Sequence, residues 1–299
     1  MSLVSFQDLM REAESGTYAV GYFESWNLES LLAVADAATR MRSPVILGFS
    51  GIHVPDIEQG DDNRLSVYAA LGKELCRQLP VASCLLFNES PHYDWVMKAI
   101  EAGFGLVMFT DENLDATDQQ DAVRRVAEKA HAAGVAVEGE MMSLAGVNGQ
   151  LDEVPKDLRL TDPSLAQSFI EDTGIDALAV NIGQAHVHGR RELPLNLSRL
   201  SEIRQAVSVP LVLHGATSIK RGHLQQAIQL GIRKINVGSI LKRAYFDAVQ
   251  NRSAKVDKEY NPYDVVGSGL EIDVLLAGRD AVRKTVEDLI SLFGSAGKS

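Results

Sequence analysis

The sequence is dominated by an alternation of short apolar runs and longer amphipathic stretches that repeats along the whole chain. The apolar runs occupy residues 18–23, 45–49, 82–87, 106–109, 135–137, 177–182, 211–213 and 235–237. Most are rich in β-branched or bulky apolar residues without strict two-residue alternation, which is typical of parallel strands buried on both faces. Helical patterns separate the runs, for example at residues 27–41, 93–101, 121–133, 163–172 and 222–230.

Eight strand–helix units in 299 residues predict an α/β fold, a (β/α)8 TIM barrel that forms one domain over residues 1–299. A doubly wound open sheet is compatible with the same alternation. The barrel is favoured because polar residues follow the predicted strands, whereas Gly, Ala, Pro and Lys precede them, and TIM barrels carry their active sites at the C-terminal strand ends. Those ends contain Glu24, Ser50, Asn88, Glu89, Thr110, Asp111, Glu138, Glu140, His186, His214 and Asn236.

The charge and the terminal sequence exclude several classes of function. The chain has 29 Lys and Arg against 40 Asp and Glu, and the net charge of −11 disfavours nucleic-acid binding. No apolar run approaches the roughly 20 residues that cross a bilayer. The N-terminus also lacks the basic and apolar regions of a signal peptide. We therefore expect a cytoplasmic protein with no membrane partner, whose backbone N–H groups can still hold an anionic metabolite.

Two histidines at neighbouring strand ends are the main indication of chemistry. His186 follows the run at residues 177–182, and His214 directly follows the run at residues 211–213. Both imidazoles are placed to converge on one divalent ion, and a carboxylate such as Glu89 or Glu140 would complete an open three-ligand site. Imidazole suits Zn, Mn, Fe or Co. In the alternative interpretation, each histidine only caps its strand by hydrogen bonding.

Small residues after the last two predicted strands indicate a phosphate site. They are Gly215, Ala216, Thr217 and Ser218 in one loop, and Asn236, Gly238 and Ser239 in the other. Such loops leave backbone N–H groups free to hold phosphate, and TIM barrels often bind phosphate after strands 7 and 8. Ordinary strand–helix turns use the same residue types, so the two loops are informative mainly because both occur where the fold places phosphate.

Segments spread over nearly the whole chain also carry a family resemblance. They are residues 18–21, 42–47, 99–104, 137–140, 161–163, 173–180, 213–215, 234–238 and 293–298. Through these segments the sequence resembles the class II, metal-dependent ketose-bisphosphate aldolases, the family that contains fructose- and tagatose-bisphosphate aldolases. The resemblance implies the TIM-barrel fold, a sugar phosphate as the small-molecule partner, and a homodimer or homotetramer.

The resemblance also implies a metal site and shows where this chain departs from it. In the family, three histidines hold a divalent metal, usually zinc, which polarises the ketose carbonyl as a Lewis acid. His186 and His214 match two of these ligands, and Glu89 stands at the third position. Asn88 stands where the family has its catalytic aspartate, and an asparagine amide cannot take up the proton that the aspartate transfers.

Other positions either keep or change the family pattern. Glu24 replaces an asparagine in the first strand, and Thr110 aligns with the aspartate of the fourth, with Asp111 one residue later. Val187 replaces a glycine whose N–H helps to hold phosphate in the family. The retained positions are Ser50, Glu140, Gly215, Asn236 and, conservatively, Ser239.

The sequence therefore predicts a divergent class II aldolase-like lyase, with zinc as the expected cofactor, that cleaves or forms a carbon–carbon bond in a sugar phosphate. The catalytic candidates are Asn88, Glu140 and Asp111, and Glu24, Glu138 and His188 are further groups able to replace the missing aspartate. A metal-dependent epimerase or isomerase of a sugar acid or ketose is an alternative, because it needs acid/base groups but not that aspartate. A non-catalytic relative that binds a sugar phosphate is a third interpretation; Asn88 favours it and the histidine pair opposes it.

Overall fold

The computed structural model describes residues 2–52, 63–142, 144, 158–185 and 192–299, and in these residues eight parallel strands close into a barrel in chain order. The strands are β1 Val20–Ser25, β2 Val45–Ser50, β3 Ser83–Ser90, β4 Leu106–Phe109, β5 Ala136–Glu140, β6 Ala177–Ala179, β7 Leu211–Leu213 and β8 Ile232–Val237. β8 pairs with β1 in parallel, which closes the sheet. The predicted TIM barrel is confirmed, and the open sheet is excluded.

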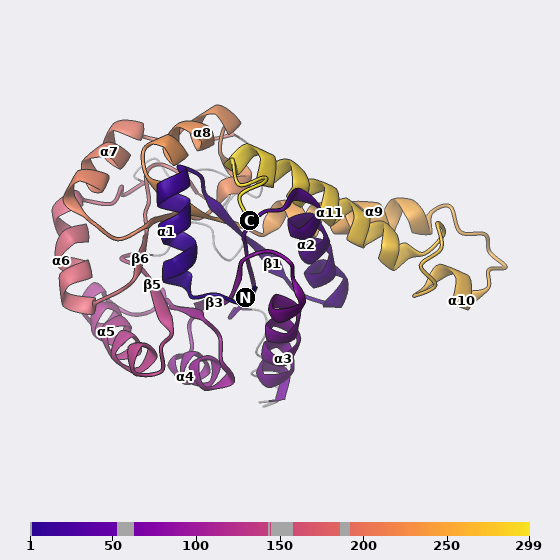
Figure 1. The fold of residues 1–299 in the computed structure, drawn as a ribbon, viewed down its shortest axis with the longest axis horizontal. Coiled ribbons are helices and arrows are strands. Elements are labelled where there is room, and N and C mark those ends of the chain that lie inside the picture. The colour runs from indigo at the N-terminus through magenta and orange to yellow at the C-terminus, as the bar shows by residue number, and fades with distance from the viewer. Residues whose placement is uncertain (1, 53–62, 143, 145–157, 186–191) are drawn as a thin grey trace.

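Helices surround this barrel (Figure 1). The α-helices of the described residues are α1 Phe6–Gly16, α2 Leu28–Met41, α3 Asn63–Gln78, α4 Tyr93–Ala102, α5 Ala116–Ala132, α6 Pro163–Thr173, α7 Leu197–Ala206, α8 Arg221–Gln229, α9 Ser239–Ser253, α10 Pro262–Val265 and α11 Val274–Phe293. The prediction that the fifth helix starts at residue 121 is wrong. α5 starts earlier because the Asp115 side chain accepts hydrogen bonds from the N–H groups of Thr117 and Asp118, both at 2.9 Å.

Five strands, β1, β2, β3, β5 and β8, extend beyond their apolar runs, which corrects the predicted strand ends; β2, for example, includes Ser50, which the sequence predicts to follow it. β1 continues to Ser25 and β3 to Ser90, so Glu24 and Asn88 lie within strands rather than after them. β8 begins at Ile232, so Lys234 lies inside a strand rather than before it. Hydrophobicity does not mark the C-terminal ends because the barrel interior becomes polar there, and its buried polar groups bind one another. The start of β8 is missed because the charged residues Arg233 and Lys234 interrupt its apolar pattern.

The opposite, N-terminal end of the barrel interior is apolar. Inward-facing residues of the strands form one buried cluster with Phe6, Leu9, Met10 and Ala13 of α1. The strand residues of this cluster include Val20, Tyr22, Ile46, Cys84, Leu86, Leu106, Ala136, Ala177 and Val212. α1 therefore covers this end of the barrel interior.

α9, α10 and α11 form an arm that extends away from the barrel (Figure 1). α9 and α11 pack against each other, and α11 also packs against α2. Several large apolar side chains of the arm are exposed: Phe246, Tyr260, Tyr263, Val266, Leu270 and Ile272. Across the part of the chain that is described, no helix has both the length and the apolar character needed to cross a membrane.

Candidate active site

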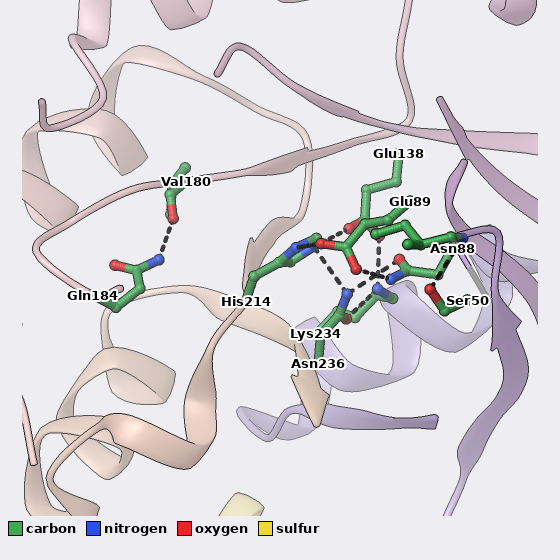
Figure 2. A network of polar contacts seen from close by, with 10 residues as sticks. Ser50, Asn88, Glu89, Glu138, Val180, Gln184, His214, Lys234 and Asn236 are labelled. Atoms are coloured by element: carbon green, nitrogen blue, oxygen red, sulfur yellow. Dashed lines mark hydrogen bonds and ion pairs between the residues drawn. The ribbon is translucent and has the colours of Figure 1, made fainter. Parts of the chain in front are cut away.

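A connected set of polar side chains fills the C-terminal end of the barrel interior (Figure 2). We call it the barrel-centre network, and its members are Asn88 and Glu89 of β3, Glu138 of β5, His214 after β7, and Lys234 and Asn236 of β8. Parallel strands all end at the same face of a barrel, so residues far apart in sequence meet there. The structure thus brings together five residues that the sequence singled out for the site: Asn88, Glu89, Glu138, His214 and Asn236.

His214 lies at the centre of the barrel-centre network. Its Nδ1 is 3.1 Å from Oε1 of Glu89, and its Nε2 is 2.7 Å from Oε1 of Glu138. Burial of the ring opposes a positive charge, but the two carboxylates outweigh this effect and raise the pKa of His214 to about 10. Both ring nitrogens thus face carboxylates, which favours the protonated ring, and a metal ion at Nδ1 would take the place of one of its protons.

Lys234 belongs to the same network, and sequence reasoning missed it. Its Nζ is 2.7 Å from Oε2 of Glu138, and both side chains are completely buried. Burial opposes the charge on Glu138, but Lys234 and His214 outweigh it and lower the pKa of this carboxyl. Burial also lowers the pKa of Lys234, although Glu138 acts against that effect. The two-residue spacing from Lys234 to Asn236, which places both on one strand face, is the signal that could have revealed it.

The amide side chains of Asn88 and Asn236 connect the rest of the network. Asn88 Nδ2 donates to Glu89 Oε2 at 2.6 Å, and Asn236 Nδ2 donates to Asn88 Oδ1 at 3.3 Å. Asn236 Oδ1 accepts a hydrogen bond from Lys234 Nζ. Asn236, which the sequence placed in a phosphate loop, is thus bonded through both its amide nitrogen and its amide oxygen inside the barrel.

Glu89 has an unusual backbone conformation. Its φ of 49° lies in the left-handed region, which non-glycine residues rarely adopt. The register between β3 and β4 shifts between Phe87 and Ser90, at the same point in the chain. Such local strain is retained where the surrounding structure requires it, often at functional sites. Here it coincides with the residue that turns its carboxylate toward His214.

Glu140 and Asp111 line a neighbouring cavity of about 430 Å³ at the ends of β4 and β5, together with Thr110 and Arg159. Glu140 is buried, and burial together with repulsion from Glu89 and Glu138 raises its pKa to about 8, against the attraction of His214. Asp111 is instead partly exposed and accepts hydrogen bonds from Asn113. Two of the predicted acid/base groups therefore share one cavity.

The two predicted phosphate loops lie at the same end of the barrel. Gly215 has a φ of 67°, and Ala216–Ser218 form a short 3-10 helix in which the Ser218 N–H donates to Gly215 O. In the other loop, Gly238 is the N-cap of α9, which starts at Ser239. Ser50, at the end of β2, is buried and accepts a hydrogen bond from the Ile52 N–H.

The barrel-centre network contains two atoms that suit a common metal ion. Nδ1 of His214 and Oε1 of Glu89 are 3.1 Å apart, and two ligand atoms that each lie about 2.0–2.2 Å from a zinc ion have a comparable separation. Glu138 contacts the other ring nitrogen, as carboxylates commonly do behind metal-bound histidines. His186 and His188 lie outside the described residues. Among those described, no three His, Cys, Asp or Glu side chains form a group able to hold a metal ion.

Comparison with known proteins places the chain within a family. The family model for class-II fructose-bisphosphate aldolase matches residues 4–298. The chain belongs to the class-II fructose-bisphosphate aldolase family. This finding confirms the resemblance predicted from the sequence, and with it the assignment to a family of aldehyde lyases that act on sugar phosphates and generally depend on a metal.

Individual relatives match over their full length. The chain is 35% identical to the fructose-bisphosphate aldolase of Geobacillus stearothermophilus, with 100% of this chain and 99% of that protein aligned. It is 33% identical to the fructose-bisphosphate aldolase of Thermus caldophilus, over 99% of this chain and 100% of that protein. Among solved structures, the YdjI aldolase of Escherichia coli K12 aligns with a TM-score of 0.78 and 27% identity, covering 99% of each chain.

Proposed function

We propose that residues 1–299 act as one domain, a metal-dependent aldolase that cleaves or forms a carbon–carbon bond in a ketose phosphate. The observation that carries this proposal is the pairing of His214 with Glu89, backed by Glu138, at the open end of the barrel. The relatives named fructose-bisphosphate aldolase support a sugar phosphate as the substrate.

His214, Glu89 and His186 would hold the metal, with zinc as the expected ion. When bound, the metal supplies a Lewis acid that polarises the substrate carbonyl. Glu138 holds the His214 ring in position through Nε2, and Lys234 balances the charge of Glu138. Because a carboxylate replaces a neutral histidine at the third position, the site carries one less positive charge, which weakens its power to polarise a carbonyl.

We assign the acid/base role to Glu140, with Asp111 as the second candidate in the same cavity. A pKa of about 8 leaves Glu140 protonated at neutral pH, so it is able to donate a proton to a developing alkoxide. Asn88 cannot transfer a proton. It instead holds Glu89 by donating to Oε2, so we propose that this chain differs in activity from family members with an aspartate there.

The loop containing Gly215, Ala216, Thr217 and Ser218 is our proposed phosphate site, and Ser50 at the end of β2 is a further proposed binding residue. The left-handed turn at Gly215 starts a short 3-10 helix, and the first N–H groups of such a turn lack partners within it. The second predicted loop, with Asn236, Gly238 and Ser239, lies at the start of α9 at the same end of the barrel.

Metal content and activity together test this function. We expect wild-type protein to bind about one zinc ion per chain and to cleave a ketose phosphate such as fructose 1,6-bisphosphate. His214→Ala removes the central ligand and should weaken metal binding by more than about 100-fold, with loss of cleavage. Atomic absorption and an aldehyde-release assay measure the two properties.

The matched control is His131→Ala, which removes an exposed imidazole that pairs with Asp176 far from the barrel-centre network. It should keep both the metal and the activity. Equal and negligible metal in wild-type protein and His214→Ala would contradict a metal enzyme, whereas bound metal without cleavage would favour a different sugar phosphate or an isomerase.

We further propose that the chain forms a homodimer through its arm. The exposed apolar side chains there include Phe246, with 64% of its surface accessible, and Tyr263, with 85%. Contiguous exposed apolar residues usually mark an interaction surface. Light scattering should give the mass of a dimer for wild-type protein and of a monomer for Phe246→Glu/Tyr263→Glu. A wild-type monomer at micromolar concentration would contradict this proposal.

A further inference from the structure

The carboxylate of Glu24 occupies the loop after β8 that the sequence assigned to phosphate. Its Oε2 lies so close to Gly238 that a Cβ atom at this position would collide with it. Gly238 is the N-cap of α9 and, as a glycine, has no side chain that could cap the helix. An anion from the protein itself therefore stands at the start of α9, where the positive end of the helix dipole favours negative charge.

The register of the barrel explains why there is room for Glu24. Gly48 is its register partner on β2, and Gly238 follows β8 on the other side. Because Gly238 has no side chain, the Glu24 carboxylate can occupy the place that a Cβ atom would take there. Its side chain keeps 14% of its surface exposed, which allows contact with a substrate.

A lysine holds this carboxylate in place. Nζ of Lys242, one turn into α9, is 2.7 Å from Oε1 of Glu24, and it also lies 5.8 Å from the centre of the Trp26 ring. Lys242 would otherwise be a cation beside the loop after β8, available to a phosphate. The ion pair thus places the negative charge of Glu24 where a phosphate would bind. It also neutralises Lys242, the cation that would otherwise attract the phosphate.

We propose that Glu24 is a specificity-determining residue that excludes phosphate from the Gly238–Ser239 side of the site and binds hydroxyl groups of the substrate there. A carboxylate accepts hydrogen bonds from hydroxyls but repels a phosphate dianion. The substrate then places its phosphate at Gly215–Ser218 and an uncharged, hydroxyl-bearing part at β1 and β8. This inference rests on the proposed function, because it refines the substrate of the same site.

Binding of inorganic phosphate, measured by isothermal titration calorimetry without turnover, tests the proposal. Glu24→Ala removes both the charge and the volume of the side chain and frees Lys242. We expect phosphate to bind this variant at least about tenfold more tightly than wild-type protein. Glu24→Gln, which keeps the volume, should give a smaller gain. Glu24→Ala/Lys242→Met should lose the gain, because it removes the cation that the phosphate reaches.

The control for net charge is Glu101→Ala, an exposed carboxylate at the end of α4, which should leave phosphate affinity unchanged. Equal phosphate affinity in wild-type protein and Glu24→Ala would overturn the proposal, and so would a gain that persists in the double variant. Because the measurement needs no catalysis, failure of the aldolase assay would contradict the proposed function and leave this result interpretable.

Discussion

Glu140→Gln is expected to stabilise the protein by about 3 kcal/mol at pH 7. Glu140 has a pKa of about 8 in the folded protein against an ordinary value of 4.5. Between pH 4.5 and about pH 8 the folded chain keeps the Glu140 proton that the unfolded chain releases. The free energy of unfolding therefore falls as pH rises through this range. Each pKa unit corresponds to about 1.4 kcal/mol, and two and a half units separate pH 4.5 from pH 7. A neutral amide of the same shape removes this cost.

Chemical denaturation of metal-free protein at several pH values measures this effect. The gain from Glu140→Gln should be small at pH 4.5, should grow through pH 7, and should level off above pH 8. Glu101→Gln, the same change at an exposed position, should shift stability by less than about 0.5 kcal/mol. A gain that is independent of pH would show that the carboxyl is not protonated in the folded state.

The same variant should lose most of its catalytic activity if Glu140 transfers a proton. A residue that destabilises the fold and is needed for the reaction is the usual compromise between stability and function. If Glu140→Gln kept full activity, Glu140 would not be the acid/base group, and Asp111, the second candidate in the same cavity, would be assigned that role.

Lys234→Met is expected to destabilise the protein by about 3–5 kcal/mol, because it leaves the completely buried Glu138 without one of its two cationic partners. Methionine keeps the length and most of the volume of the lysine, so the loss reports the charge rather than a cavity. Urea denaturation monitored by circular dichroism measures it.

Two comparisons make this result specific to the buried pair. Arg221→Met breaks the exposed pair with Asp288 and should cost at most about 1 kcal/mol. Lys234→Met/Glu138→Leu removes both members of the buried pair and should recover part of the loss, since no uncompensated carboxylate remains. A double variant no more stable than Lys234→Met would attribute the loss to packing.

The apolar runs predict the barrel because buried parallel strands need apolar residues on both faces, and β4 and β7 coincide with their predicted ranges. The strand-end pattern also predicts that Glu89 and His214 converge, since all parallel strands open at one face. These inferences need only the positions of the apolar runs and the fact that all strands of the barrel run in the same direction.

The pairing partners could not be predicted in this way. Lys234 interrupts an apolar run, so the pattern places it before its strand, and only the closed barrel shows that it meets Glu138 of β5. The contact between Glu24 and Gly238 likewise depends on the pairing of β1 with β8, the two ends of the strand order. Sequence periodicity identifies which face a residue occupies, whereas the curvature of the closed sheet decides what lies opposite.

The charges in the barrel-centre network also bear on the order in which the chain assembles. His214 is 76 residues away from Glu138 and 125 residues away from Glu89. A half-barrel that ended at β5 would hold both carboxylates without His214 or Lys234, and burying such uncompensated charges is costly. Only the arrival of β7 and β8 neutralises them. The polar centre therefore disfavours a stable half-formed barrel and makes closure of the last strands a cooperative event.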